Sequence, residues 1–160
     1  MRKIDQLLSV YGESHQNAIN KLIHWICVPV IMFTMLGLIW NIPSQGLNLI
    51  FGKSKPEWFN WSTLILIPII LYYLRLSFAL FTGMSLIALL ITLGHLYLAR
   101  LGPSGHLLTC TALFVAAWIG QFYGHMVEGK KPSFLQDAQF LLIGPAWLLH
   151  FIYRRLGIPY

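Results

Sequence analysis

Residues 22–40 read LIHWICVPVIMFTMLGLIW, and no charged residue falls between Lys21 and Lys53. A helix needs roughly 20 apolar residues to cross a bilayer core, so this stretch predicts a membrane-spanning helix. We expect it not to be a cleaved signal peptide, because it is too long and lacks a small-residue cleavage site.

Four further stretches are free of charged residues. They lie between Glu57 and Arg75, Arg75 and Arg100, Arg100 and Glu128, and Asp137 and Arg154. The second and fifth apolar stretches are short and contain a proline, so each is either a tilted span or a re-entrant segment. The predicted spans are residues 22–40, 58–74, 79–101, 106–127 and 138–154. We therefore expect an all-α bundle of four to five transmembrane helices, forming a single integral membrane domain over residues 1–160.

A short amphipathic helix is predicted before the first span. Ile4, Leu7, Leu8 and Tyr11 recur at i, i+3, i+4 and i+7, which places them on one helical face. This face either lies on the membrane surface or packs on another part of the protein. Between the spans, close helix contacts are expected at the small residues Gly37, Gly83, Gly94, Gly120 and Gly124.

The composition favours a membrane protein over a soluble one. Apolar types make up 57% of the 160 residues and charged types only 10%, where soluble domains average about 25% charged. The net charge of +6 does not indicate nucleic-acid binding, because the basic residues lie singly or in pairs between uncharged runs, as they do around membrane spans. Cys27 and Cys110 lie inside apolar runs, which indicates small core residues and not a disulfide framework.

One cluster of polar residues precedes the first span. Asn20 and His24 are four residues apart and share a helix face, but His15 and His24 are nine apart, about 13 Å along a straight helix. The two histidines can share a metal only if the helix breaks between them, near Asn17 or just before it. The alternative is that His24 is an interfacial histidine hydrogen-bonded to Asn20.

A second cluster ends the fourth span. Gln121, His125 and Glu128 fall at i, i+4 and i+7 on one helix face. Three polar side chains at the end of an apolar span favour a site, and the alternative is an exposed helix end whose Glu128 pairs with Lys131.

The topology brings the two clusters together. The start of the first span and the end of the fourth lie on the same side of the membrane, so His15, His24, His125 and Glu128 lie together. His95, His106 and His150 fall toward the other side, where we expect interfacial histidines or core hydrogen bonds. Histidines and a carboxylate with open positions are typical of non-heme Fe(II) sites, although imidazole also suits Zn, Cu and Ni. The sequence has no HExxH, GxSxG or phosphate-binding loop.

The residues of both clusters resemble the motifs of a known family. The first motif contains His15, Asn20, His24 and Pro29, and the second contains Gln121, Gly124, His125, Glu128 and Pro132. In their order and separation these motifs resemble those of the small membrane proteins typified by the fungal 2-hydroxy-fatty-acid dioxygenase. The resemblance covers residues from about 5 to 150.

The resemblance implies an iron(II)-dependent enzyme that uses O₂ to shorten a 2-hydroxy fatty acid by one carbon and releases CO₂. It implies that the Fe²⁺ ligands are His15, His24 and His125. It makes Asn20, Gln121 and Glu128 the candidate catalytic residues, which either add ligands or orient them. The substrate carboxylate and hydroxyl would chelate the metal, and we expect the acyl tail between the spans, near Phe33, Trp40 and Phe122.

Two other functions remain open from the sequence. A non-catalytic protein that binds membrane lipid or scaffolds a partner would hold no metal, and a zinc-dependent membrane hydrolase or transporter would not need O₂. Transporters usually show internal repeats, and none is visible here. We expect a bacterial inner membrane in preference to the endoplasmic reticulum, and no nucleic-acid partner.

Overall fold

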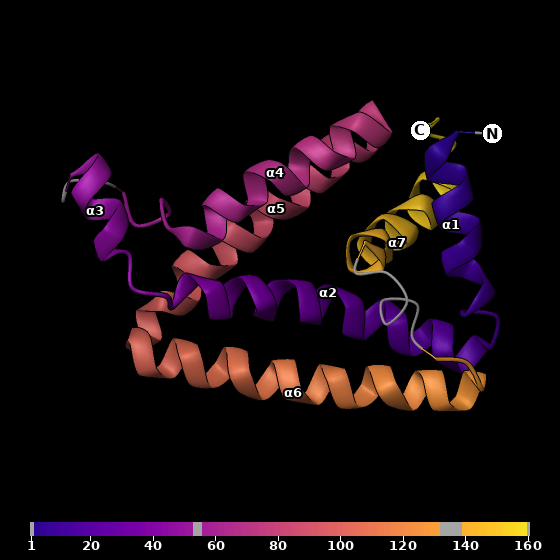
Figure 1. The fold of residues 1–160 in the computed structure, drawn as a ribbon. Helices are drawn as coiled ribbons and strands as arrows, with labels where there is room; N and C mark the ends of the chain where they lie inside the picture. The colour runs from indigo at the N-terminus through magenta and orange to yellow at the C-terminus, as the bar shows by residue number, and fades with distance from the viewer. Residues whose placement is uncertain (1, 53–55, 132–138, 160) are drawn as a thin grey trace.

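The computed structural model describes residues 2–52, 56–131 and 139–159, and every regular element in these ranges is a helix (Figure 1). Pro132 of the second motif and residue 138, the expected start of the fifth span, lie outside these ranges. The helices are α1 (Lys3–Glu13), α2 (Ala18–Trp40), α3 (Gln45–Phe51), α4 (Trp61–Leu76), α5 (Phe78–Leu98), the 3₁₀ turn η1 (Ala99–Leu101), α6 (Gly102–Glu128) and α7 (Phe140–Leu156).

The helices α2, α4, α5, α6 and α7 match the five predicted stretches to within a few residues at each end. The predicted N-terminal helix is α1, and it packs on α7 with Ile4, Leu8 and Tyr11 buried. Of the two alternatives for its apolar face, packing within the protein is therefore confirmed. The short helix α3 was not predicted, because it lies in a connection with turn residues on both sides.

Two antiparallel helices, α2 and α6, run side by side along their length (Figure 1). His24 near the start of α2 meets Gln121 near the end of α6, and Asn41 just after α2 meets His106 near the start of α6. A Cβ at Gly120 would lie 2.8 Å from the Cys27 sulfur, so this glycine permits the close approach. The expected small-residue contacts are confirmed, since an added Cβ at each of the five glycines would crowd a neighbouring side chain.

Helices α1, α4, α5 and α7 form an apolar core beside this pair. Helices α4 and α5 pack against each other, and α7 contacts α1, α2 and α5. Two tyrosine hydroxyls tie these helices together: Tyr73 donates to the Leu142 carbonyl at 2.6 Å, and Tyr153 donates to the Ala79 carbonyl at 2.6 Å. These bonds fix the position of α7 against α4 and α5.

Two described stretches, Ala18–Trp40 and Phe78–Glu128, are long and apolar enough to cross a membrane. The second contains both α5 and α6, which are separated by η1, and α6 begins at Gly102 with a φ of +77°. The apolar helix α4 has 16 residues, and α7 has 17 and ends with two arginines. By length and composition these stretches indicate membrane association, while the number of four to five transmembrane helices stays a prediction.

Candidate metal centre

A break between α1 and α2 brings His15 close to His24. Helix α1 ends at Glu13, and Asn17 caps α2 with its side-chain oxygen, which accepts from the Ile19 N–H at 2.8 Å. Asparagine is a favoured residue at this position because it satisfies an unpaired amide of the first turn. The break predicted near Asn17 is confirmed.

Three histidine rings meet at this break and are almost fully buried. The His15, His24 and His125 side chains are 1%, 0% and 4% exposed. The ring centroids of His15 and His24 are 4.2 Å apart, and that of His125 lies 5.2 Å and 4.9 Å from them. One potential ligand atom from each ring lies within 4.8 Å of the other two. The structure therefore brings all three predicted ligands together.

The hydrogen bonds of the rings decide which nitrogens are free to bind a metal. His15 Nδ1 lies 2.6 Å from the Tyr11 carbonyl and His24 Nδ1 lies 2.9 Å from the Asn20 carbonyl. A carbonyl only accepts, so Nδ1 carries the proton in both rings and Nε2 keeps a lone pair. His125 Nδ1 is buried and has no hydrogen-bond partner.

These free nitrogens fit a metal ion. His15 Nε2 and His125 Nδ1 are buried without a hydrogen-bond partner, which is costly unless another group satisfies them. Burial lowers the pKa of His15 to about 4, so this imidazole is neutral at physiological pH and available as a ligand. Backbone carbonyls that orient the imidazoles are a common support for metal-binding histidines. The donor set suits several divalent metals.

Gln121 lies directly against this centre. Its Nε2 donates to His24 Nε2 at 2.7 Å, while its Oε1 is buried without a partner. An amide that turned away from His24 would free that nitrogen for a metal and would present its N–H groups to a neighbouring anion. Gln121 is thus adjacent to the centre, as the motif predicts.

Glu128 and Asn20 hold the segment that carries His15. The Glu128 carboxylate accepts from the Gln16 N–H at 2.8 Å, the Asn17 N–H at 2.9 Å and Asn20 Nδ2 at 3.0 Å. A carboxylate at a helix N-terminus is stabilised by the unpaired amides there. Asn20 Nδ2 also donates to the Ser14 carbonyl at 3.1 Å. These hydrogen bonds tie the segment before α2 to the end of α6, and Glu128 is not in the group of described residues that could hold a metal ion.

A second buried group lies at the other end of the α2–α6 pair. His95, His106 and Cys110 have potential ligand atoms within 4.8 Å of one another. His95 Nε2 donates to the Phe33 carbonyl at 3.0 Å, and its Nδ1 lies 3.2 Å from His106 Nε2. Core hydrogen bonds for His95 and His106, away from the first centre, are therefore confirmed. His150 on α7 belongs to neither group.

Two aromatic residues at the centre were missed as parts of it. The Tyr11 ring stacks on His15 at a centroid distance of 4.2 Å, and the Trp147 ring lies 5.2 Å from His15. Tyr11 stands four residues before His15, and this spacing was the available signal. Nothing in the sequence around Trp147 points to the centre, because this residue is far from both histidine motifs along the chain.

The three aromatic residues expected around an acyl tail do not lie together at the first histidine centre. Phe33 stacks on His95 at 4.1 Å and Trp40 lies 5.6 Å from the same ring, so both belong to the second histidine group. Phe122 is half exposed on α6. The apolar cavity nearest the centre has other walls, because α4, α5 and α7 pack against α2 there.

Comparison with known proteins gives one match. No curated protein and no solved structure matches the chain. A family model described as "Mpo1-like: 2-hydroxy-palmitic acid dioxygenase Mpo1-like" matches residues 1–156, which includes both histidine motifs.

Proposed function

Because the chain belongs to the Mpo1-like family, we propose that it is an Fe²⁺-dependent dioxygenase acting on 2-hydroxy fatty acids. One 2-hydroxy acid and one O₂ would give the acid shortened by one carbon, one CO₂ and one water. Carbon 2 becomes a carboxyl carbon and carbon 1 leaves as CO₂, so the four electrons lost by the substrate reduce one O₂ completely.

The observation that carries this proposal is the set of buried imidazole nitrogens at one point. His15, His24 and His125 would hold the ion through His15 Nε2, His24 Nε2 and His125 Nδ1. When bound, ferrous iron would supply the redox activity that passes the electrons of the substrate to O₂ and the Lewis acidity that binds an α-hydroxy carboxylate. Three protein ligands would leave room at such an ion for these reactants.

Gln121 is the candidate for binding the substrate head. Its amide already lies at the centre and has an unpaired oxygen, so it would donate its N–H groups to the carboxylate and accept from the 2-hydroxyl. Asn20 and Glu128 would act through His15, because they fix the backbone of residues 14–17. Their contribution is to hold the ligands in position.

The membrane is the expected location for such a substrate. The centre lies at one end of the α2–α6 pair, so a polar head would reach the metal while the chain stays in an apolar layer. We infer that four to five helices span the bilayer. A bacterial inner membrane remains our expectation over the endoplasmic reticulum.

The first experiment measures metal and turnover together. The detergent-purified protein and His125→Ala would be reconstituted anaerobically with Fe²⁺, analysed by elemental mass spectrometry, and assayed with 2-hydroxypalmitic acid with and without O₂. We expect stoichiometric iron and O₂-dependent CO₂ release in the wild type, and neither in the variant.

Other outcomes would favour the other functions. Stoichiometric zinc with O₂-independent activity would indicate a hydrolase. No metal in either protein would indicate a lipid-binding or scaffolding protein, and a fully active His125→Ala variant would exclude this centre as the site.

A further inference from the structure

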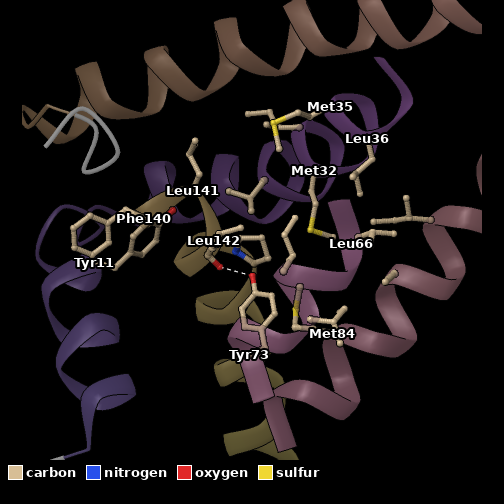
Figure 2. A pocket seen from close by; sticks show the side chains of 18 of the residues that line it. Tyr11, Met32, Met35, Leu36, Leu66, Tyr73, Met84, Phe140, Leu141 and Leu142 are labelled. Atoms are coloured by element: carbon tan, nitrogen blue, oxygen red, sulfur yellow. Dashed lines mark hydrogen bonds between the residues drawn. The ribbon is translucent and has the colours of Figure 1, made fainter. Parts of the chain in front are cut away.

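An apolar cavity of about 70 Å³ lies between α2, α4, α5 and α7 (Figure 2). Tyr11 and Gln121 are part of its wall and also contact the centre, through His15 and His24 respectively. Tyr11 and Phe140 lie on one side of the cavity in Figure 2, and Leu66 and Met84 lie on the opposite side. The cavity therefore leads from the histidines toward α4 and α5.

The wall away from the centre presents hydrocarbon. Leu66, Met84 and Ala88 belong to it, and the hydroxyl of Tyr73 is already bonded to the Leu142 carbonyl at 2.6 Å. Met84 and Ala88 are both buried, so this end is closed by α5. A ligand with a polar head and an unbranched apolar tail matches this distribution, with its head at Gln121 and its tail toward α5.

Three methionines make the cavity adaptable. Met32, Met35 and Met84 are in the wall, and methionine side chains are unbranched and change shape readily. A volume of about 70 Å³ holds only part of a long chain. Entry of the tail thus requires these side chains to rotate, and the residues behind them limit how far the tail extends.

We propose that this cavity receives the acyl chain of the 2-hydroxy acid and that Met84 and Ala88 on α5 set the longest chain that fits. The proposal rests on the proposed function, since the head must sit at the histidine centre. It replaces the expected tail environment around Phe33, Trp40 and Phe122 with the space between α2, α4, α5 and α7.

The test uses photo-crosslinking, which does not require turnover. Two analogues of 2-hydroxypalmitic acid carry a diazirine, one at the terminal carbon and one near the head. They are added to the Fe²⁺-reconstituted protein under anaerobic conditions, and labelled peptides are identified by mass spectrometry. We expect the terminal probe to label Leu66 or Met84 and the head probe to label residues near Tyr11, both in competition with unlabelled 2-hydroxypalmitic acid. Labelling confined to exposed residues of α5 such as Leu86 and Leu89 would overturn the proposal.

A matched pair of variants tests the length limit. Ala88→Phe fills the closed end, and Ala112→Phe makes the same change on the exposed face of α6. We expect Ala88→Phe to reduce labelling by the long probe about tenfold and to leave labelling by a 2-hydroxyoctanoic acid analogue unchanged, because only the long chain meets the added ring. Ala112→Phe should change neither. Equal labelling of Ala88→Phe and the wild type by the long probe would overturn the proposal.

A second variant, Met84→Ala, tests the length limit even if Ala88→Phe does not fold. Met84→Ala enlarges the cavity at its closed end. We therefore expect this variant to bind, and be labelled by, analogues longer than 2-hydroxypalmitic acid that the wild type excludes. An unchanged length limit would overturn the role of Met84. Internal labelling without O₂-dependent turnover would support the cavity and reject the dioxygenase reaction, whereas turnover with only external labelling would reject the cavity alone.

Discussion

Two groups of buried histidines lie at opposite ends of the α2–α6 pair. They differ in the hydrogen-bond partners of their ring nitrogens. In the second group each ring nitrogen has a partner: the Asn41 amide donates to His106 Nδ1 at 2.7 Å, His106 meets His95, and His95 meets the Phe33 carbonyl. In the first group His15 Nε2 and His125 Nδ1 have none.

Clustering and burial of histidines alone therefore do not identify a metal site. Both groups meet the same distance criterion. A metal at the second group would have to displace hydrogen bonds that already satisfy both imidazoles. A metal at the first would displace only the Gln121 amide from His24 Nε2 and would satisfy two nitrogens that are otherwise unpaired. We therefore infer that the second group stabilises the helix pair and the first binds the ion.

The largest expected effect separates the groups by metal affinity. His24→Ala should weaken iron binding by more than about 100-fold, because even residues that only orient ligands contribute 10- to 100-fold. His95→Ala should bind as much iron as the wild type. Elemental analysis of both variants after anaerobic reconstitution checks this, and loss of iron from His95→Ala alone would reverse the assignment of the two groups.

A smaller effect is expected on stability at the second group. His106→Leu removes the donor to His95 Nδ1 and the acceptor for the Asn41 amide, which should lower the free energy of unfolding by about 1–3 kcal/mol. Thermal unfolding in detergent measures the change, with the exposed neighbour Leu107→Ala as the control. Iron content should stay that of the wild type, and unchanged stability would show that the network does not contribute.

The smallest effect is expected on iron affinity when Glu128, which is hydrogen-bonded to the segment next to His15, is changed. Glu128→Gln places an amide N–H where three donors meet a carboxylate, so the segment carrying His15 loosens. We expect about tenfold weaker iron binding in a competition assay with a chelator. Glu13→Gln changes an exposed carboxylate whose side chain has no such role and should leave affinity unaltered. Complete loss of iron from Glu128→Gln would instead indicate that this carboxylate is itself a ligand.

Much of the fold follows from the spacing of charged residues. Long uncharged runs give the positions of α2, α5 and α6, and the i, i+3, i+4 pattern gives α1. The partner of α1 could not be predicted, since an apolar face specifies burial but not against which surface. Helix α3 was missed because turn residues surround it and it is only seven residues long.

The sequence predicted which residues come together at the candidate site, but it did not predict all of their contacts. Helix spacing put Gln121, His125 and Glu128 on one face and required a break before His24, both of which the structure shows. The pairing of His95 with His106 was missed, although they flank the turn at Gly102. The walls of the cavity were also missed, because contacts among α4, α5 and α7 leave no local signal in the sequence.

The contact between Asn17 and Glu128 spans 111 residues of chain, and this separation sets the order in which the centre is assembled. During synthesis, the segment from α1 to α2 emerges with His15 and His24 long before α6 supplies His125, and α4 and α5 must be placed in the meantime. Contacts between distant segments form late and slowly in folding. Substitutions that misplace α4 or α5 during membrane insertion would therefore yield protein without metal, although none of them touches a ligand.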